Sequence, residues 1–544
     1  MSQRLLMLGL DGVGTVVFDR LARDGVIPNL AMLGQTGTYA ALRATVPPIT
    51  GPSWLGVSTG LDVDQTGIAD FLVRRPPLYD LRPIGSRDFR GRAVWDLVGA
   101  AGFRTCVFNF PILYPPYDAN GIMVSGFGTD ESTQWTSPAS IKEELIEVVG
   151  RDYNLAVNYH AEHYDDVGRF LDDLEASFDR RVRAAEWLLQ REPWDLAVCV
   201  FSETDWLMHR CWDLLDTACE PYSSEQQARS DRVRDVFARL DAAVPRLLDA
   251  MGTGASLLVC SDHGFGPNTC TFKINAALEQ AGLLVRRGSS TQRSASLHRA
   301  GVRIAQRAGA AAARVRGPVG RTLARVRRRA RRLLPKDDSA FLSAVVDSES
   351  SVVLDPGHTI PFAGLYTGTR IERGTGKYDA ALGSVDELLA ETSAGTGISI
   401  SAIRPWQLAG GLIDTLPDLL VSGDDWGMTF SKTDFDGPLL VPGPFSRRHT
   451  GSHRLDGIYV ASGPLFSHSP AGEKASVLDI APTVLAAFGL AAPADRRGSI
   501  LPAFCGGVDG LATASTVDST DAREPTEDDD EDVRERLRGL GYIE

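Results

Sequence analysis

The chain has 544 residues, 43% of them hydrophobic, and a formal net charge of −14. A chain of this length can bury a large core, and we expect it to form more than one structural unit. No apolar stretch is long enough to span a membrane and the start lacks a signal-peptide pattern, while seven cysteines without framework spacing predict reduced thiols, so we expect a cytoplasmic protein.

The first predicted element is an apolar strand over residues 5–10, which Asp11 follows directly. A Pro/Gly-rich turn at residues 47–54 then offers two hydroxyls, Thr50 and Ser53, where a helix is expected to begin. The free N–H groups and partial positive charge of a helix N-terminus suit a phosphate. The turn is therefore a candidate site for a hydroxyl nucleophile.

Two further apolar runs end in residues that can bind a metal ion. Residues 196–201 precede Asp205 and His209, which lie four apart, so a helical turn brings both onto one face. Another run ends just before Asp262 and His263, an adjacent carboxylate and imidazole. Because α/β folds place ligands at the carboxyl ends of parallel strands, we expect these side chains to meet at one edge of a sheet.

A strongly basic segment follows, with fifteen Arg, one Lys and no acid between residues 286 and 336. It predicts amphipathic helices that contact an anionic membrane surface or an anionic substrate, and the alternative is a solvated insertion docked on the acidic body. No base-reading module accompanies the charge, so specific nucleic-acid recognition is not expected. Residues 286–400 together predict a basic insertion and a small cap, with strands near 351–354 and 364–366.

The core resumes over residues 401–506, where His453 lies just before an apolar strand at 457–461 and His449 in the same loop is its rival as a ligand. Residues 507–544 predict an acidic linker and a short amphipathic helix that docks on the body or on a second subunit.

Strands and helices alternate over residues 1–285, the first part of the core. Together with the second part they predict an α/β fold, a doubly wound and mostly parallel sheet with helices on both faces and an inserted cap region. The oligomeric state cannot be read from the sequence.

Taken in order, these segments resemble the alkaline phosphatase superfamily, specifically its type I phosphodiesterase/nucleotide pyrophosphatase branch. The motifs that carry the resemblance are residues 8–12, 50–54 with 59–61, 201–205 with His209, 261–266 and 451–453. Further stretches resemble a prokaryotic subgroup of predicted phosphohydrolases or phosphomutases, namely residues 108–111 with 114–116, 479–483 and 540–543. The resemblance implies an alkaline-phosphatase-like sheet.

The resemblance also implies two divalent metal ions and a covalent phospho-threonine formed at Thr50. One ion, best matched by zinc, would be held by Asp205, His209 and His453. The other, which could be zinc, manganese or magnesium, would be held by Asp11, Asp262, His263 and the Thr50 oxygen. Paired ions can stabilise both the attacking and the leaving oxygen of an in-line displacement.

The chain departs from this family where relatives commonly have His-Gly-Ile and then an Asn, since it has Thr66-Gly67-Ile68 and Asp70-Phe71. The departure argues against a nucleotide pyrophosphatase substrate, and the absence of a Cys-x-Pro-x-Arg signature argues against sulfate esters. Further substrate-binding candidates are Asp70, Lys273 and Asn275.

The sequence thus predicts a metal-dependent phosphodiesterase that acts on a small phosphate ester or diester in the cytoplasm, with a peripheral membrane contact through residues 286–336 as an added interpretation. The alternatives with the same metal site are a phosphomutase, a phosphomonoesterase and a phosphonate hydrolase. A non-enzymatic alternative is a binding protein derived from such an enzyme.

Overall fold

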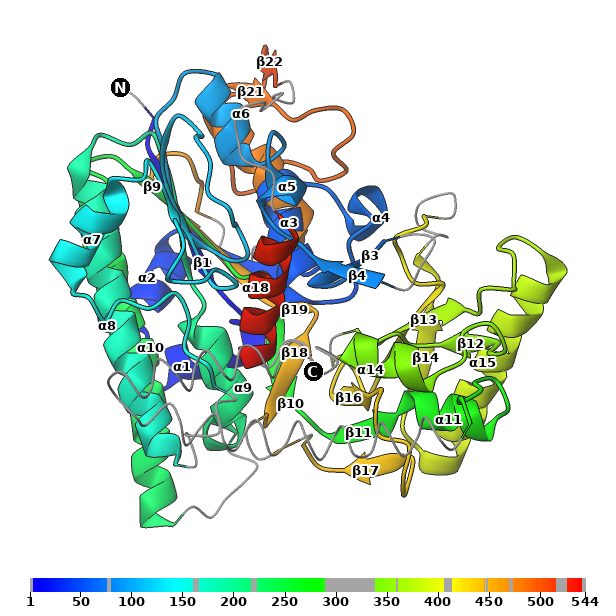
Figure 1. The fold of residues 1–544 in the computed structure, drawn as a ribbon. Helices are drawn as coiled ribbons and strands as arrows, with labels where there is room; N and C mark the ends of the chain where they lie inside the picture. The colour runs from blue at the N-terminus through cyan, green and yellow to red at the C-terminus, as the bar shows by residue number, and fades with distance from the viewer. Residues whose placement is uncertain are drawn as a thin grey trace, which may run out of the picture.

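The computed structural model describes most of the chain in two lobes (Figure 1). The described residues are 3–75, 80–159, 166–216, 223–288, 338–358, 361–405, 413–444, 446, 449–468, 473–514 and 526–540. The predicted amphipathic helices of the basic segment lie outside them, apart from residues 286–288. None of the described helices is long and apolar enough to cross a membrane.

The larger lobe is organised around a sheet of nine strands among the described residues. In spatial order these are β20 (Ala475–Ser476), β2 (Thr38–Arg43), β19 (Asp456–Ser462), β9 (Ser256–Cys260), β1 (Leu5–Leu10), β8 (Leu196–Phe201), β5 (Thr105–Phe110), β6 (Gly121–Ser125) and β7 (Thr136–Ser137). The central strands β9, β1, β8, β5 and β6 are parallel, and each is an apolar run that is buried almost throughout. Such runs are typical of strands covered on both faces.

Helices cover both faces of the sheet, as Figure 1 shows. One layer comprises α1 (Thr15–Arg23), α2 (Pro28–Thr36), α7 (Ile141–Val149), α8 (Val167–Arg191), α9 (Glu203–Leu215) and α10 (Ser224–Ala250). The other comprises α3 (Thr50–Thr59), α4 (Val63–Thr66), α5 (Ser86–Phe89), α6 (Val94–Ala100), the short η2 (Val477–Asp479) and α17 (Ile480–Ala487). The predicted α/β fold with a large, mostly parallel sheet is confirmed.

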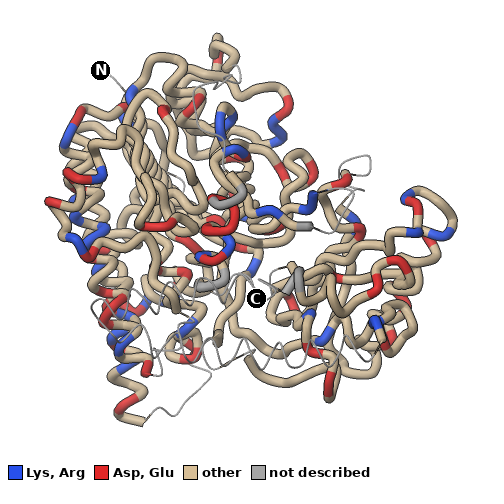
Figure 2. The backbone as a smooth tube through the Cα atoms, viewed as in Figure 1, with Lys and Arg blue, Asp and Glu red and all other residues tan. Residues whose placement is uncertain are grey.

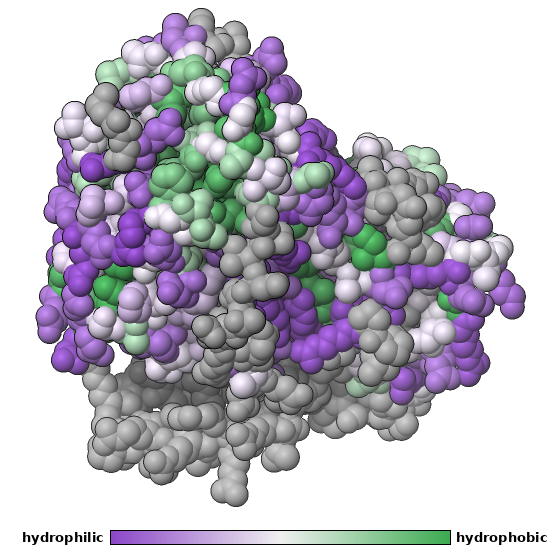
Figure 3. Space-filling view, turned by 90° about the horizontal axis from the view of Figure 1, so that it is seen from above, coloured by the Kyte–Doolittle hydropathy of each residue, from purple (hydrophilic) through white to green (hydrophobic). Residues whose placement is uncertain are grey.

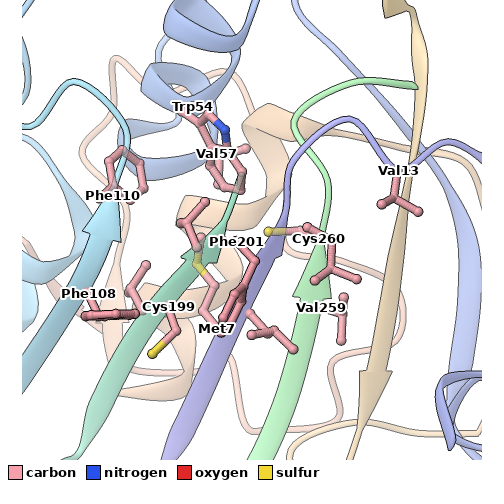
Figure 4. Packing of buried hydrophobic residues seen from close by; sticks show 14 of the residues in the cluster. Met7, Val13, Trp54, Val57, Phe108, Phe110, Cys199, Phe201, Val259 and Cys260 are labelled. Atoms are coloured by element: carbon pink, nitrogen blue, oxygen red, sulfur yellow. The ribbon is translucent and has the colours of Figure 1, made fainter. Parts of the chain in front are cut away.

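Packing fixes helix α3 against the sheet (Figure 4). Trp54 of α3 is fully buried and meets the ring of Phe110 edge to face at 5.5 Å. Its indole also covers Gly9 of β1, where a Cβ atom would lie 2.4 Å from the ring. The glycine therefore lets the helix lie close to the central strands, which places the start of α3 at their carboxyl ends.

The second lobe has its own hydrophobic cluster, drawn from residues 270–284 and 341–440. It contains a sheet of β16 (Met428–Ser431), β11 (Cys270–Lys273) and β17 (Leu440–Pro442), and another of β12 (Val353–Leu354), β13 (Ala363–Thr367), β15 (Leu419–Gly423) and β14 (Ile400–Ile403). Its helices are α11 (Ile274–Gln280), α14 (Asp338–Val345) and α15 (Gly376–Thr396). The cluster extends beyond both ends of the predicted insertion at 286–400, because the strands on either side of the insertion pair with one another.

Three further pairs of short strands lie outside these sheets. Strand β10 (Gly264–Pro267) pairs with β18 (Gly451–Arg454), so the chain leaves and re-enters the larger lobe along one ribbon. Strand β3 (Leu72–Arg75) pairs with β4 (Asp80–Pro83), and β21 (Leu490–Ala491) pairs with β22 (Ala512–Thr513).

The C-terminal helix α18 (Glu527–Gly539) docks on the larger lobe, as one of the two sequence alternatives predicted. Val533, Leu537 and Leu540 are buried in the main core. Asp530 lies 2.7 Å from Arg75 and 2.5 Å from Arg87, where Figure 2 shows acidic and basic positions side by side. Seen from above, the described surface is mostly hydrophilic, with a more apolar area on the larger lobe (Figure 3).

Candidate active site

The sequence-predicted ligands come together at one edge of the main sheet. Asp11 follows β1, and Asp262 and His263 follow β9. Asp205 and His209 lie in α9, which begins directly after β8. Strands β1, β8 and β9 are parallel neighbours, so their carboxyl ends reach the same edge.

His453 reaches this edge from the opposite chain direction. It lies in β18, just before β19, which pairs antiparallel with β9. The start of an antiparallel strand lies beside the end of its neighbour, and this explains why the ligand precedes its strand here and follows the strands elsewhere.

The first group of side chains comprises Asp205, His209 and His453. The Nε2 atoms of the two histidines are 3.0 Å apart. Nε2 of His209 lies 3.4 Å from Oδ1 of Asp205, and Nε2 of His453 lies 3.3 Å from the same oxygen. All three side chains are buried. The spacing would let one cation contact all three ligand atoms.

The second group comprises Asp11, Asp262, His263 and Thr50. Nε2 of His263 lies 3.7 Å from Oδ1 of Asp11, 3.2 Å from Oδ2 of Asp262 and 3.1 Å from the Thr50 hydroxyl. The rings of His263 and His453 stack at 3.7 Å, so the two groups adjoin. Potential ligand atoms of Asp205, His263 and His453, and those of Asp11, Asp262 and His263, each lie within 4.8 Å of one another.

Backbone carbonyls orient all three imidazole rings. Nδ1 of each ring contacts a carbonyl oxygen, and the acceptors for His209, His263 and His453 are Gly451 (3.1 Å), Gly264 (3.0 Å) and Pro48 (2.8 Å). This assigns the proton to Nδ1 and leaves each Nε2 as an acceptor that faces the cluster. Two facing acceptors at 3.0 Å repel one another unless a cation lies between them, so the histidines fit a metal site.

The electrostatics of the cluster also fit cations. Within the described residues, neither side-chain oxygen of Asp11, nor Oδ2 of Asp262, accepts a hydrogen bond. Burial, reinforced by the charges of neighbouring carboxylates, raises the pKa of Asp11 and of Asp262 well above the ordinary range. Burial and the neighbouring His453 lower the pKa of His263. Divalent cations would compensate the buried negative charge and occupy the unused oxygens.

Thr50 stands at the start of α3, as predicted, and Ile49 is its N-cap. The rival hydroxyl of Ser53 is 2.8 Å from that of Thr45, which turns it away from the cluster. The hydroxyl of Thr50 instead meets His263. Of the two candidate hydroxyls, that of Thr50 therefore contacts a predicted ligand, and its role as a nucleophile stays a prediction.

His449 does not join either ligand group. Its ring packs against that of His209 at 4.6 Å. The ring of Tyr159 also stacks on that of His209, at 5.0 Å. These rings support the orientation of His209. Tyr159 carries no motif signal in the sequence, and only the fold brings it here.

A buried ion pair, which sequence reasoning missed, holds α9. Arg181 of α8 lies 2.9 Å from Glu203, and both side chains are at most 1% exposed. In addition, the Thr204 hydroxyl donates to the carbonyl of Asp11 at 2.6 Å. Neighbouring residues of α9 thus fix the helix that carries Asp205 and His209.

The three predicted substrate-binding residues lie outside the ligand cluster. Lys273 lies 2.8 Å from Asp434. Asn275 donates hydrogen bonds to the carbonyls of Asp355 and Lys432. The carboxylate of Asp70 contacts His358 of the second lobe. Their direct contact with substrate stays a prediction.

Comparison with known proteins identifies the family of this chain. Residues 5–355 match the model of the family described as type I phosphodiesterase / nucleotide pyrophosphatase. No curated protein matches the sequence.

This chain is also similar to solved structures. The phosphonoacetate hydrolase of Sinorhizobium meliloti 1021, solved with phosphonoformate, is 14% identical with a TM-score of 0.51, and the match covers 90% of this chain and 96% of that one. Human ectonucleotide pyrophosphatase / phosphodiesterase 5 is also 14% identical, with a TM-score of 0.47 and coverage of 88% and 93%. At this identity the hydrolase establishes a shared fold.

Proposed function

Because this chain belongs to the type I phosphodiesterase/nucleotide pyrophosphatase family, a family of phosphoric ester hydrolases, we propose that it hydrolyses phosphodiesters with Thr50 as the nucleophile. The observation that carries the proposal is the place of the Thr50 hydroxyl, 3.1 Å from His263, where the two ligand groups adjoin at the N-terminus of α3. The N–H groups of that helix end suit a phosphate oxygen.

Seven side chains would hold two divalent cations and the reacting phosphate. The first group matches the preference of zinc for imidazole and carboxylate ligands, and it comprises Asp205, His209 and His453. The second group offers more oxygen ligands, and it comprises Asp11, Thr50, Asp262 and His263. When bound, the cations would lower the pKa of the threonine hydroxyl and neutralise charge on the phosphate.

The reaction would follow two displacements at phosphorus. The Thr50 oxygen forms a bond to phosphorus, loses its proton to solvent, and expels one alcohol of the diester. Water then attacks the same phosphorus, and the threonine oxygen leaves and regains a proton, so the products are an alcohol and a phosphate monoester. The N–H groups at the N-terminus of α3 would hold the oxygens of the reacting phosphate through both steps.

The charge around Thr50 supports a diester as the substrate. Residues 45–60 contain no Lys or Arg, so the nucleophile turn offers no guanidinium to a second anionic oxygen. Three buried aspartates, Asp11, Asp205 and Asp262, lie in the two ligand groups. A diester carries one negative charge where a monoester carries up to two, so a diester needs fewer cationic side chains around it.

Hydrolysis of bis-p-nitrophenyl phosphate, compared with p-nitrophenyl phosphate, tests the proposal. Metal-stripped protein should be inactive, and zinc or manganese should restore diesterase activity. Thr50→Ala should lose at least about 10³-fold in kcat because the nucleophile is gone. Ser53→Ala is the matched control and should retain activity.

Other outcomes would redirect the assignment. Activity confined to the monoester would favour a phosphatase or a mutase, and full activity of Thr50→Ala would reject the nucleophile. Failure to bind any divalent metal would reject the metal site itself.

A further inference from the structure

One buried pair joins the two lobes beside the nucleophile helix. Nδ1 of His358, in the second lobe, lies 2.9 Å from Oδ2 of Asp70, and its Nε2 lies 3.2 Å from the hydroxyl of Tyr366. His358 is 4% exposed and Asp70 is fully buried. Burial strengthens such a contact and makes either polar group costly to leave without its partner. The pair therefore fixes one lobe against the other at a defined point.

The second lobe holds His358 rigidly. The carboxylate of Asp355 accepts the backbone N–H groups of Gly357 at 2.8 Å, His358 at 3.1 Å and Gly364 at 3.0 Å. Asn275 in turn exchanges two 3.0 Å hydrogen bonds with the backbone of Asp355. A Cβ atom at Gly364 would lie 2.4 Å from the imidazole, so this glycine leaves the room that the ring occupies.

On the other side, Asp70 connects to the nucleophile turn. Its Oδ1 accepts the N–H of Phe71 at 2.7 Å, and the carbonyl of Phe71 accepts the N–H of Ile84 at 2.9 Å. The side chains of Phe71 and Ile84 pack on Gly51, with atoms 3.2 Å and 2.7 Å from where its Cβ would lie. Gly51 directly follows Thr50, so this pair forms the surface on which the first turn of α3 rests.

We propose that His358 is a positioning residue, through which the second lobe holds Asp70, the Phe71–Ile84 pair and hence Thr50 in place for attack. The inference rests on the proposed function for the role of Thr50. It also gives Asp70 and Asn275 a task in the support of the nucleophile. The second lobe thereby contributes to the catalytic geometry without contacting the reacting phosphate.

Three variants separate this role from simple stability. His358→Ala removes the contact with Asp70, whereas His358→Asn keeps an N–H donor at the position of Nδ1. Tyr378→Phe is the matched control, because it deletes another buried hydrogen bond of the second lobe, 3.0 Å from Asp418, that does not lead to Asp70.

Kinetics and amide hydrogen exchange of metal-free protein give two readouts. His358→Ala should lower kcat by about 10–100-fold, since small misplacements of reacting groups cost this much. Its KM should change by less than about threefold, because substrate binding is retained. Peptides covering residues 45–60 should exchange faster in His358→Ala, while His358→Asn and Tyr378→Phe should match the wild type in both measurements.

The inference is overturned if His358→Ala leaves both kcat and exchange unchanged, if Tyr378→Phe produces the same effects, or if His358→Asn fails to restore them. Should the wild-type protein hydrolyse no phosphoester, the proposed function fails. The exchange of residues 45–60 still decides whether His358 fixes the turn.

Discussion

At the scale of single residues, burial decides how the acidic side chains behave. Asp11 and Asp262 lie at the candidate metal site, and burial, reinforced by the charges of neighbouring carboxylates, raises their pKa values. Asp96 lies away from the site, in the first turn of α6, where it accepts the N–H of Ala93 at 3.1 Å and the hydroxyl of Tyr117 at 3.3 Å. Burial raises the pKa of Asp96 to about 7 despite these bonds.

This shift predicts a measurable pH dependence of stability. The folded state keeps the Asp96 proton up to about pH 7, whereas the unfolded chain releases it near the ordinary pKa of 3.8. The stability that Asp96 contributes is therefore fully present below about pH 4 and is lost as the pH rises to 7. Asp96→Asn, which cannot ionise, should gain stability relative to the wild type between pH 5 and 7.

Urea unfolding at several pH values checks this prediction, with Asp249→Asn on the exposed face of α10 as the control. A constant difference between Asp96→Asn and the wild type from pH 5 to 8 would contradict it.

At the scale of elements, helix α9 must carry two ligands and also keep its place over the sheet. The ion pair of Arg181 and Glu203 joins it to α8, and the guanidinium lies 5.0 Å from the ring of Trp206. Both charges are out of contact with water. Loss of one partner would leave the other charge buried without compensation.

Arg181→Met and Glu203→Leu should each lower the free energy of unfolding by about 3–5 kcal/mol. The double variant Arg181→Met/Glu203→Leu should recover most of this loss, because it buries no lone charge. Denaturant unfolding of the four proteins completes the cycle. Single variants that cost less than about 1 kcal/mol would show that the pair does not hold α9.

The elements that carry the predicted ligands could be predicted because their signals lie close together in the sequence. Asp11, Asp205 and Asp262 each follow an apolar run, and the spacing of Asp205 and His209 matches one helical turn. Such signals involve only neighbouring residues, so they can be recognised from the sequence alone. The start of α3 at Thr50 was equally local, since it rests on a Pro/Gly-rich turn.

The partners that hold these elements could not be predicted. Asp70 and His358 are 288 residues apart, and His453 meets the carbonyl of Pro48 across 405 residues. No periodicity links such positions, because only the folded sheet and the return of the chain through β18 bring them together. For the same reason the second lobe draws on residues on both sides of the predicted insertion.

At the scale of the whole molecule, the site is assembled from nearly the full length of the chain. Its ligands run from Asp11 to His453, and the second lobe lies between Asp262 and His453 in the sequence. The ribbon of β10 and β18 joins the two lobes directly beside the histidines, with Phe265 opposite His453. The metal ligands therefore converge only where the chain returns from the second lobe to the larger one.

The central claim is that Thr50 becomes covalently attached to the phosphorus of a diester. The most direct test mixes metal-restored protein with bis-p-nitrophenyl phosphate, quenches it in acid within one turnover, and maps the modified peptides by mass spectrometry. We predict a p-nitrophenyl phosphoryl group on Thr50, absent from chelator-treated protein and from Thr50→Ala. Release of p-nitrophenol without any adduct on Thr50, or an adduct on another residue, would contradict the account.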